Sequence, residues 1–181
     1  MSRLTIHADD HPETPEIVHV DTPAIREALA SHGVRFDRVT ALVDLAPGAS
    51  AADVLAAYAP FIEAEKVAAG FATADVVRIP RGTPNTAPMR AKFLSEHVHT
   101  EDEARLFAEG SGAFYLHLGN RVLVVVCERG DYLRVPAGTR HWFDMGPDPD
   151  FTAVRLFTNP EGWVAQFTGD SIADRFPGYE R

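Results

Sequence analysis

The sequence predicts a mainly β fold with flanking α-helices, because its 181 residues show two different patterns that meet near residue 75. Before that point, apolar residues recur at helical spacing behind helix-start signals; after it, short apolar runs alternate with turn signals. Many short strands with regular turns are typical of a barrel or jelly roll. We therefore expect one domain, residues 1–181, with a helical part over about 1–74, a barrel over about 75–170, and helices packed outside the barrel.

Capping signals predict the helices of the first part. Asp21, followed by Thr-Pro, is a capping residue with proline in the first turn, and Gly33 ends that segment. Ser50 begins the next segment, where Asp53 can complete a capping box. Pro60 lacks an N–H and crowds the preceding turn, so it should divide this segment into two helices.

The second part is expected to consist of short strands, preceded by a short helix over residues 85–94. Glycine-rich and Gly-Asn turn signals separate the apolar runs, including Glu-Gly-Ser-Gly at residues 109–112. The expected strands are residues 75–79, 106–107, 113–118, 122–128, 131–135 and 152–157.

Composition excludes several classes of protein. The formal net charge is −9 at pH 7, and an acidic surface repels phosphate backbones, so nucleic acid is not an expected partner. The single cysteine, Cys127, excludes an internal disulfide and is expected to be a buried apolar residue. The longest apolar run is too short to cross a membrane, and residues 1–10 contain no apolar signal core, so we expect a cytoplasmic protein.

Most of the eight histidines suit ordinary structural roles. His7, His11, His19 and His32 lie in polar sequence and are expected to be surface or capping residues. His117 lies in an expected strand, where it should face outward or be hydrogen-bonded in place.

One cluster has the spacing of a metal site. His97 and His99 would lie on the same face of a strand, because side chains alternate with period two. Glu103 follows a short acidic turn, and His141 follows a tight turn at the start of another apolar run. Imidazoles and a carboxylate on one side of a metal leave open positions for oxygen and substrate, as in non-haem iron oxygenases. The alternative is an exposed His-x-His pair that binds no metal.

Two segments resemble the paired motifs of the cupin superfamily. Residues 97–110 read HVHTEDEARLFAEG, similar to the first motif, and residues 130–141 read GDYLRVPAGTRH, similar to the second. Met145 departs from the asparagine that follows the second motif. The resemblance implies a double-stranded β-helix barrel. The residues that it assigns to one metal ion are His97, His99, Glu103 and His141.

A longer resemblance, over residues 75–160, is to the acireductone dioxygenase family of methionine salvage. It is carried by FLSEH at 93–97, EAR at 103–105, EGSG at 109–112 and VPAGTRHWFDMG at 135–146. It implies a monomer that binds Fe²⁺ or Ni²⁺ and cleaves 1,2-dihydroxy-3-oxo-5-methylthiopentene with O₂. Iron implies formate and 4-methylthio-2-oxobutanoate as products, whereas nickel implies formate, carbon monoxide and 3-methylthiopropanoate.

Four charged residues are further candidates for the active site. Arg105 lies two residues past Glu103 on the same strand face and can stabilise an ionised ene-diol; the alternative is an ion pair with a nearby glutamate. Arg155 lies in an apolar strand, so it should orient a carboxylate or face the cavity. Glu96 and Asp102 flank the expected ligands, and each either hydrogen-bonds an imidazole or lies in a solvated loop.

Four aromatic residues can wall the methylthio tail of the substrate, although each also suits core packing. They are Phe93, Phe107, Trp142 and Phe143.

Two other functions fit the same motifs. Another cupin enzyme, such as a different dioxygenase or a sugar isomerase, need not contain the stretch 139–144. A non-catalytic cupin that binds a small ligand or senses metal would tolerate loss of Arg105 and Arg155 and would close the coordination sphere.

Overall fold

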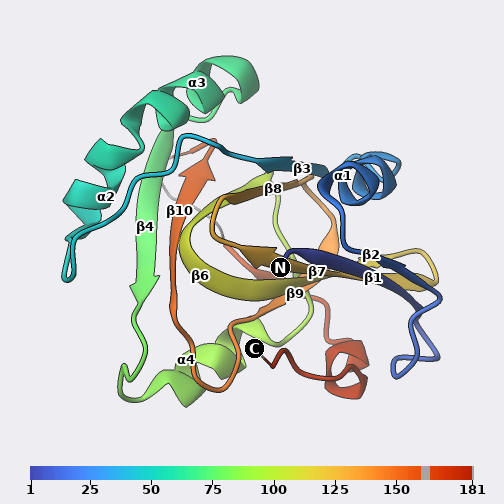
Figure 1. Cartoon of the computed structure of the whole chain (residues 1–181). Coiled ribbons are helices and arrows are strands. Elements are labelled where there is room, and N and C mark those ends of the chain that lie inside the picture. The colour runs from blue at the N-terminus through green and yellow to red at the C-terminus, as the bar shows by residue number, and fades with distance from the viewer. Residues whose placement is uncertain (160–163, 181) are drawn as a thin grey trace.

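The computed structural model describes residues 1–159 and 164–180, and its strands form two β layers that share one long strand (Figure 1). The helices are α1 (Thr22–Ala30), α2 (Ala51–Ala57), α3 (Ala59–Ala69) and α4 (Thr86–Phe93), with a short 3₁₀ helix at Ile172–Arg175. The strands are β1 (Arg3–Ala8), β2 (Ile17–His19), β3 (Arg35–Arg38), β4 (Thr73–Ile79), β5 (His97–Val98), β6 (Glu103–Leu118), β7 (Arg121–Glu128), β8 (Asp131–Val135), β9 (Arg140–Asp144), β10 (Phe151–Phe157) and β11 (Gln166–Phe167).

Strand pairing defines the two layers. One layer has the order β11-β5-β9-β6-β7-β1-β2, and the other has the order β4-β10-β6-β8-β3. The pairs between these neighbouring strands are antiparallel, as expected for a jelly roll. Within the described ranges, the layers face each other but their backbone pairing does not close into a ring.

Strand β6 belongs to both layers because it bends near Gly110. Its first half pairs with β8 and β10, and its second half pairs with β7 and β9. Gly110 has φ +66°, and the register with β10 shifts between Thr152 and Ala153, which marks a β-bulge. The sequence prediction of a turn at 109–112 was therefore wrong: the glycines bend one continuous strand rather than end it.

Side chains on β6 alternate between the interior and the two outer faces. Phe107 and Phe114 pack in the interior cluster between the layers. Leu106 packs outward against helices α2 and α3, and Tyr115 packs outward against the C-terminal segment. Alternation with period two therefore gives each layer an apolar face on both sides.

The predicted helix signals are confirmed. Asp21 caps α1, Ser50 and Asp53 form the capping box of α2, and α3 follows with Pro60 in its first turn. Helices α2 and α3 lie outside the layer that contains β4 and β10 (Figure 1). The sequence also predicted α4, which the structure places at Thr86–Phe93.

The first 74 residues are not purely helical, which corrects the sequence prediction. Strand β1 pairs with β7 over six residues, and β3 pairs with β8 over four. These short strands have few apolar residues, and their burial comes from partners more than 80 residues away. His7 on β1 is correspondingly buried, whereas the sequence predicted a surface or capping position.

No helix in the part of the chain that the structure describes is long and apolar enough to span a membrane.

Replacing Gly110 by alanine should test the bend in β6. A Cβ there would lie 1.8 Å from the Asp150 backbone oxygen, so the backbone must shift. Gly119 has the same φ of +66°, but a Cβ at that position would have no neighbour within 4 Å, so it isolates the cost of the dihedral angle. We expect Gly119→Ala to lower the free energy of unfolding by about 1–2 kcal/mol. Gly110→Ala should cost about 1–3 kcal/mol more.

Urea unfolding of the two variants measures both costs. Equal losses would contradict the steric role assigned to Gly110.

Candidate metal centre

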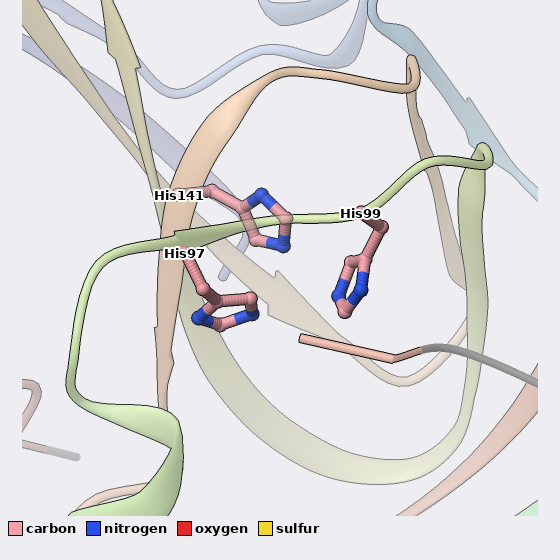
Figure 2. Close-up of side chains that lie close together, drawn as sticks. All are labelled: His97, His99 and His141. Atoms are coloured by element: carbon pink, nitrogen blue, oxygen red, sulfur yellow. The ribbon is translucent and has the colours of Figure 1, made fainter. Parts of the chain in front are cut away.

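Three histidines from neighbouring segments converge in the structure (Figure 2). His97 on β5 pairs directly with His141 on β9, and His99 follows β5. All three are buried, and one ligand nitrogen from each lies within 4.8 Å of the others. The ring centroids of His97 and His141 are 4.5 Å apart, and His99 lies 5.0 and 5.2 Å from them.

Backbone carbonyls orient each imidazole. Nδ1 of His97 lies 2.8 Å from the Ser95 oxygen, and Nδ1 of His141 lies 2.7 Å from the Thr139 oxygen. Nδ1 of His99 lies 3.2 Å from the Val164 oxygen. A carbonyl only accepts hydrogen bonds, so each Nδ1 must donate, and each Nε2 remains available as a ligand in the neutral ring.

Glu103 adds a carboxylate to this cluster from the start of β6. Its Oε2 lies 2.8 Å from His141 Nε2 and 3.3 Å from His99 Nε2. When two ligand atoms each lie about 2.1 Å from one ion and their bonds to it are at right angles, the two atoms are about 3 Å apart. The separations of Glu103 from His141 and from His99 therefore fit a cation shared with those two rings.

The charge of Arg105 holds Glu103 in place. Its Nε lies 2.7 Å from Glu103 Oε1, the oxygen that does not face His99 and His141. Burial alone would raise the pKa of Glu103, but the positive charge of Arg105 outweighs that effect. The pKa of Glu103 therefore lies well below its usual range, and the carboxylate is ionised.

Burial has the opposite effect on His97. Desolvation, together with the neighbouring His141, lowers the pKa of His97 to about 4. The ring is therefore neutral at pH 7, as metal binding requires.

Arg105 is buried beneath aromatic rings. Its guanidinium carbon lies 4.7 Å from the centroid of the Phe143 ring and 5.1 Å from that of Phe114. Burial lowers the pKa of Arg105, while the charge of Glu103 opposes that shift. Of the two alternatives for Arg105, the ion pair with a glutamate is present, but it is buried and its partner belongs to the histidine cluster.

Glu96 bonds an imidazole, one of its two expected roles, whereas Asp102 bonds a guanidinium and a backbone amide. Buried Glu96 bonds the imidazole of His117, not that of a neighbouring candidate ligand. Asp102 accepts hydrogen bonds from Arg134 Nε at 2.7 Å and the Ala137 amide at 3.0 Å. These two bonds of Asp102 connect the loop before β6 to strand β8 and to the turn that follows β8.

Arg155 orients a carboxylate, one of its two expected roles. Its Nε lies 2.7 Å from Asp75 Oδ1, in a pair that joins β10 to β4. Arg155 also lies opposite Arg105 in the register of β10 and β6, so both side chains are on the same face. The positive charge of Arg155 contributes to the lowered pKa of Arg105.

The aromatic candidates separate into two groups. Phe93, Phe107 and Phe143 belong to or pack against the interior cluster. Trp142 instead stacks on Tyr115 in the outer cluster, with ring centroids 5.0 Å apart. Of its two expected roles, Trp142 therefore has that of core packing. Side chains alternate along β9, so the Trp142 side chain points outward while that of Phe143 points inward.

The sequence pattern did not reveal two contributors to the site. Val164 acts through its backbone oxygen, which no side-chain pattern reveals. His117 was expected to be hydrogen-bonded in place, but the spacing of residues did not identify Glu96 as its partner.

The buried donor set of three imidazoles and one carboxylate suits a divalent metal ion.

Comparisons with known proteins identify the family of this chain. The sequence model of the ARD/ARD′ family matches residues 3–165. A protein from Gluconobacter oxydans named acireductone dioxygenase is 52% identical over 178 residues, covering 98% of this chain and 94% of that protein. One from Pseudomonas paraeruginosa with the same name is 54% identical over 177 residues, covering 98% of each chain.

A solved structure is similar as well. It is described as acireductone dioxygenase from Bacillus anthracis with cadmium ion in its active center, and it matches with a TM-score of 0.78 and 26% identity. The match covers 92% of this chain and 98% of that one, and it confirms the predicted cupin-type fold with flanking helices. The chain belongs to the ARD/ARD′ family, the acireductone dioxygenases.

Proposed function

We propose that the chain binds one divalent metal ion, Fe²⁺ or Ni²⁺, and cleaves 1,2-dihydroxy-3-oxo-5-methylthiopentene with O₂ in methionine salvage. The observation that carries the proposal is the convergence of three histidine rings and one carboxylate in a buried site. Family membership and the names of the relatives support the substrate and the reaction.

The two product sets differ in the carbon atoms that they release. The iron form would yield formate and 4-methylthio-2-oxobutanoate, and the nickel form would yield formate, carbon monoxide and 3-methylthiopropanoate. Each set contains all the atoms of one substrate molecule and one O₂. When bound, the metal would act as a Lewis acid that stabilises the ionised ene-diol and fixes its orientation.

The proposed ligands are His97, His99, Glu103 and His141. Four ligands would leave two positions of an octahedral ion free, which suits a substrate with adjacent oxygens. The Nδ1 hydrogen bonds to carbonyls hold the three rings in one tautomer and one orientation.

We assign Arg105 to the substrate as well as to Glu103. Its Nε contacts Glu103, and the guanidinium carries further N–H donors for a substrate oxygen. A buried cation favours the deprotonated ene-diol, because it lowers the free energy of the anion more than that of the neutral form. Arg155, which lies opposite Arg105 on the same face, is held in a fixed position by its ion pair with Asp75.

A monomeric, cytoplasmic protein is part of this proposal. The support is the acidic net charge of −9 and the family resemblance. Analytical ultracentrifugation of the metal-loaded protein would test the monomer, and a species of twice the mass of 19.8 kDa would contradict it.

Product analysis tests the proposed reaction. Metal-free protein reconstituted with Fe²⁺ or with Ni²⁺ is given the acireductone and O₂, and products are identified by NMR. We expect carbon monoxide only from the nickel form and the 2-oxo acid only from the iron form. Substrate that decays at the rate of the buffer control with both metals would contradict the proposal.

Arg105→Ala should lower turnover on the order of 10²-fold, as loss of one donor to a developing anion does. Arg105→Lys keeps the charge but loses the planar donor, so partial rescue would indicate charge and no rescue would indicate geometry. Metal content and urea unfolding are measured on the same preparations.

Arg38→Ala is the matched control, because Arg38 also pairs with a buried carboxylate, that of Asp131, outside the histidine cluster. Normal turnover of Arg105→Ala with full metal content would rule out the substrate role. Equal losses of stability and activity in both variants would show that Arg105 is only a structural partner of Glu103.

A further inference from the structure

His117 and Glu96 form a buried pair beside the metal centre. Nδ1 of His117, near the end of β6, lies 2.5 Å from Glu96 Oε1. Both side chains are buried, and Glu96 immediately precedes His97 in the chain. The pair therefore links the second half of β6 to the segment that supplies two of the proposed ligands.

Hydrogen bonds from Thr168 also hold Glu96. The Thr168 hydroxyl donates to Glu96 Oε2 at 2.6 Å, and the Thr168 amide donates to the Glu96 backbone oxygen at 3.1 Å. The backbone of Glu96 connects Ser95 to His97, so its dihedral angles set the hydrogen bond between the Ser95 oxygen and His97 Nδ1. Fixing Glu96 therefore fixes the direction of the His97 ring.

The other ring nitrogen of His117 faces the second histidine-bearing strand. Its Nε2 lies 3.4 Å from Arg140 Nη2 and 3.8 Å from Asp9 Oδ2, and His117 pairs with Arg140 in the register of β6 and β9. An imidazole that donates from Nδ1 to a carboxylate can accept at Nε2 from a guanidinium. Arg140 immediately precedes His141.

Short strands need such support. Strand β5 has two residues, and among the described residues its register with β9 consists of the single pair His97 with His141. A strand of that length has few ladder hydrogen bonds to fix its orientation. Side-chain contacts from His117 to Glu96 and Arg140 reach the residue before each of two proposed ligands.

We propose that His117 is a positioning residue for the metal centre, which it orients through Glu96 on one side and Arg140 on the other. This inference rests on the proposed function, because it takes His97 and His141 as ligands. Loss of a partner outside the ligands themselves typically weakens metal binding about 10–100-fold. His117 acts one contact further out than such a partner, so we expect metal binding to weaken by about tenfold.

Two polar substitutions of His117 separate its contacts without removing polarity. The amide nitrogen of asparagine takes the place of Nδ1 and can still donate to Glu96, whereas that of glutamine takes the place of Nε2. His7 provides matched controls, since it is similarly buried on β1 in the same layer and bonds Thr5 through Nε2. The four variants are His117→Asn, His117→Gln, His7→Asn and His7→Gln.

Co²⁺ serves as the probe, because its visible absorption bands report ligand geometry. Each full-length protein is freed of metal, its thermal unfolding is recorded, and Co²⁺ affinity and spectrum are measured by titration. We expect His117→Gln to bind Co²⁺ about tenfold more weakly than the wild type and with shifted bands. His117→Asn keeps the contact with Glu96 and loses the longer contact with Arg140, so its affinity should lie between those of His117→Gln and the wild type. Both His7 variants should stay close to the wild type.

The outcomes separate this inference from the proposed function. If the wild type binds no Co²⁺, the metal site itself is wrong and the inference fails with it. If the wild type binds and His117→Gln matches His117→Asn in affinity and spectrum, the inference alone fails. His7→Asn loses the bond from Nε2 to Thr5, so it matches the loss of the Glu96 contact in His117→Gln. Equal weakening in His117→Gln and His7→Asn, in step with equal losses of thermal stability, would also overturn the inference by showing a merely structural effect.

Discussion

The shared strand β6 is the constraint on which the candidate site depends. Glu103 and Arg105 lie in its first half, and His117 lies near its other end, where the strand pairs with β9. Because the strand bends at Gly110 instead of ending, one stretch of backbone holds the carboxylate in one layer and supports the histidines in the other. The core packing on both sides of β6 fixes that bend.

Burial and neighbouring charges set the protonation states of Glu103 and His97. A buried carboxylate alone would tend to take up a proton, yet the charge of Arg105 keeps Glu103 ionised. His97 is driven toward its neutral form by burial. The site therefore presents the Glu103 anion together with the neutral ring of His97, a combination that suits a divalent cation. An ion would also compensate the desolvation of the carboxylate.

The sequence predicts what depends on short-range spacing. The His-x-His pair brings two rings to one site, although only His97 lies on β5 and His99 follows it. The capping residues Asp21 and Ser50 fix helix starts, because each of these patterns acts over a few residues. The glycines near Gly110 were wrongly predicted to form a turn, because a positive φ serves a bend as well as a turn.

What the sequence does not predict arises from contacts between distant segments. Strand β1 is buried by β7, more than 100 residues away, so its own composition did not reveal it. The partner of His99 is a backbone oxygen, and Glu96 turns toward His117 because of the register between strands. The alternation of side chains along β9 predicts that Trp142 and Phe143 face opposite ways, but it does not say which of the two faces the interior. That choice depends on the other strands that pack against β9.

Anomalous diffraction from crystals of the nickel-loaded protein tests the central claim most directly. The account predicts one nickel peak per chain, about 2.0–2.3 Å from Nε2 of each of the three histidines and from one oxygen of Glu103. A peak bound through any Nδ1, a peak without Glu103, or nickel only outside this cluster would contradict it.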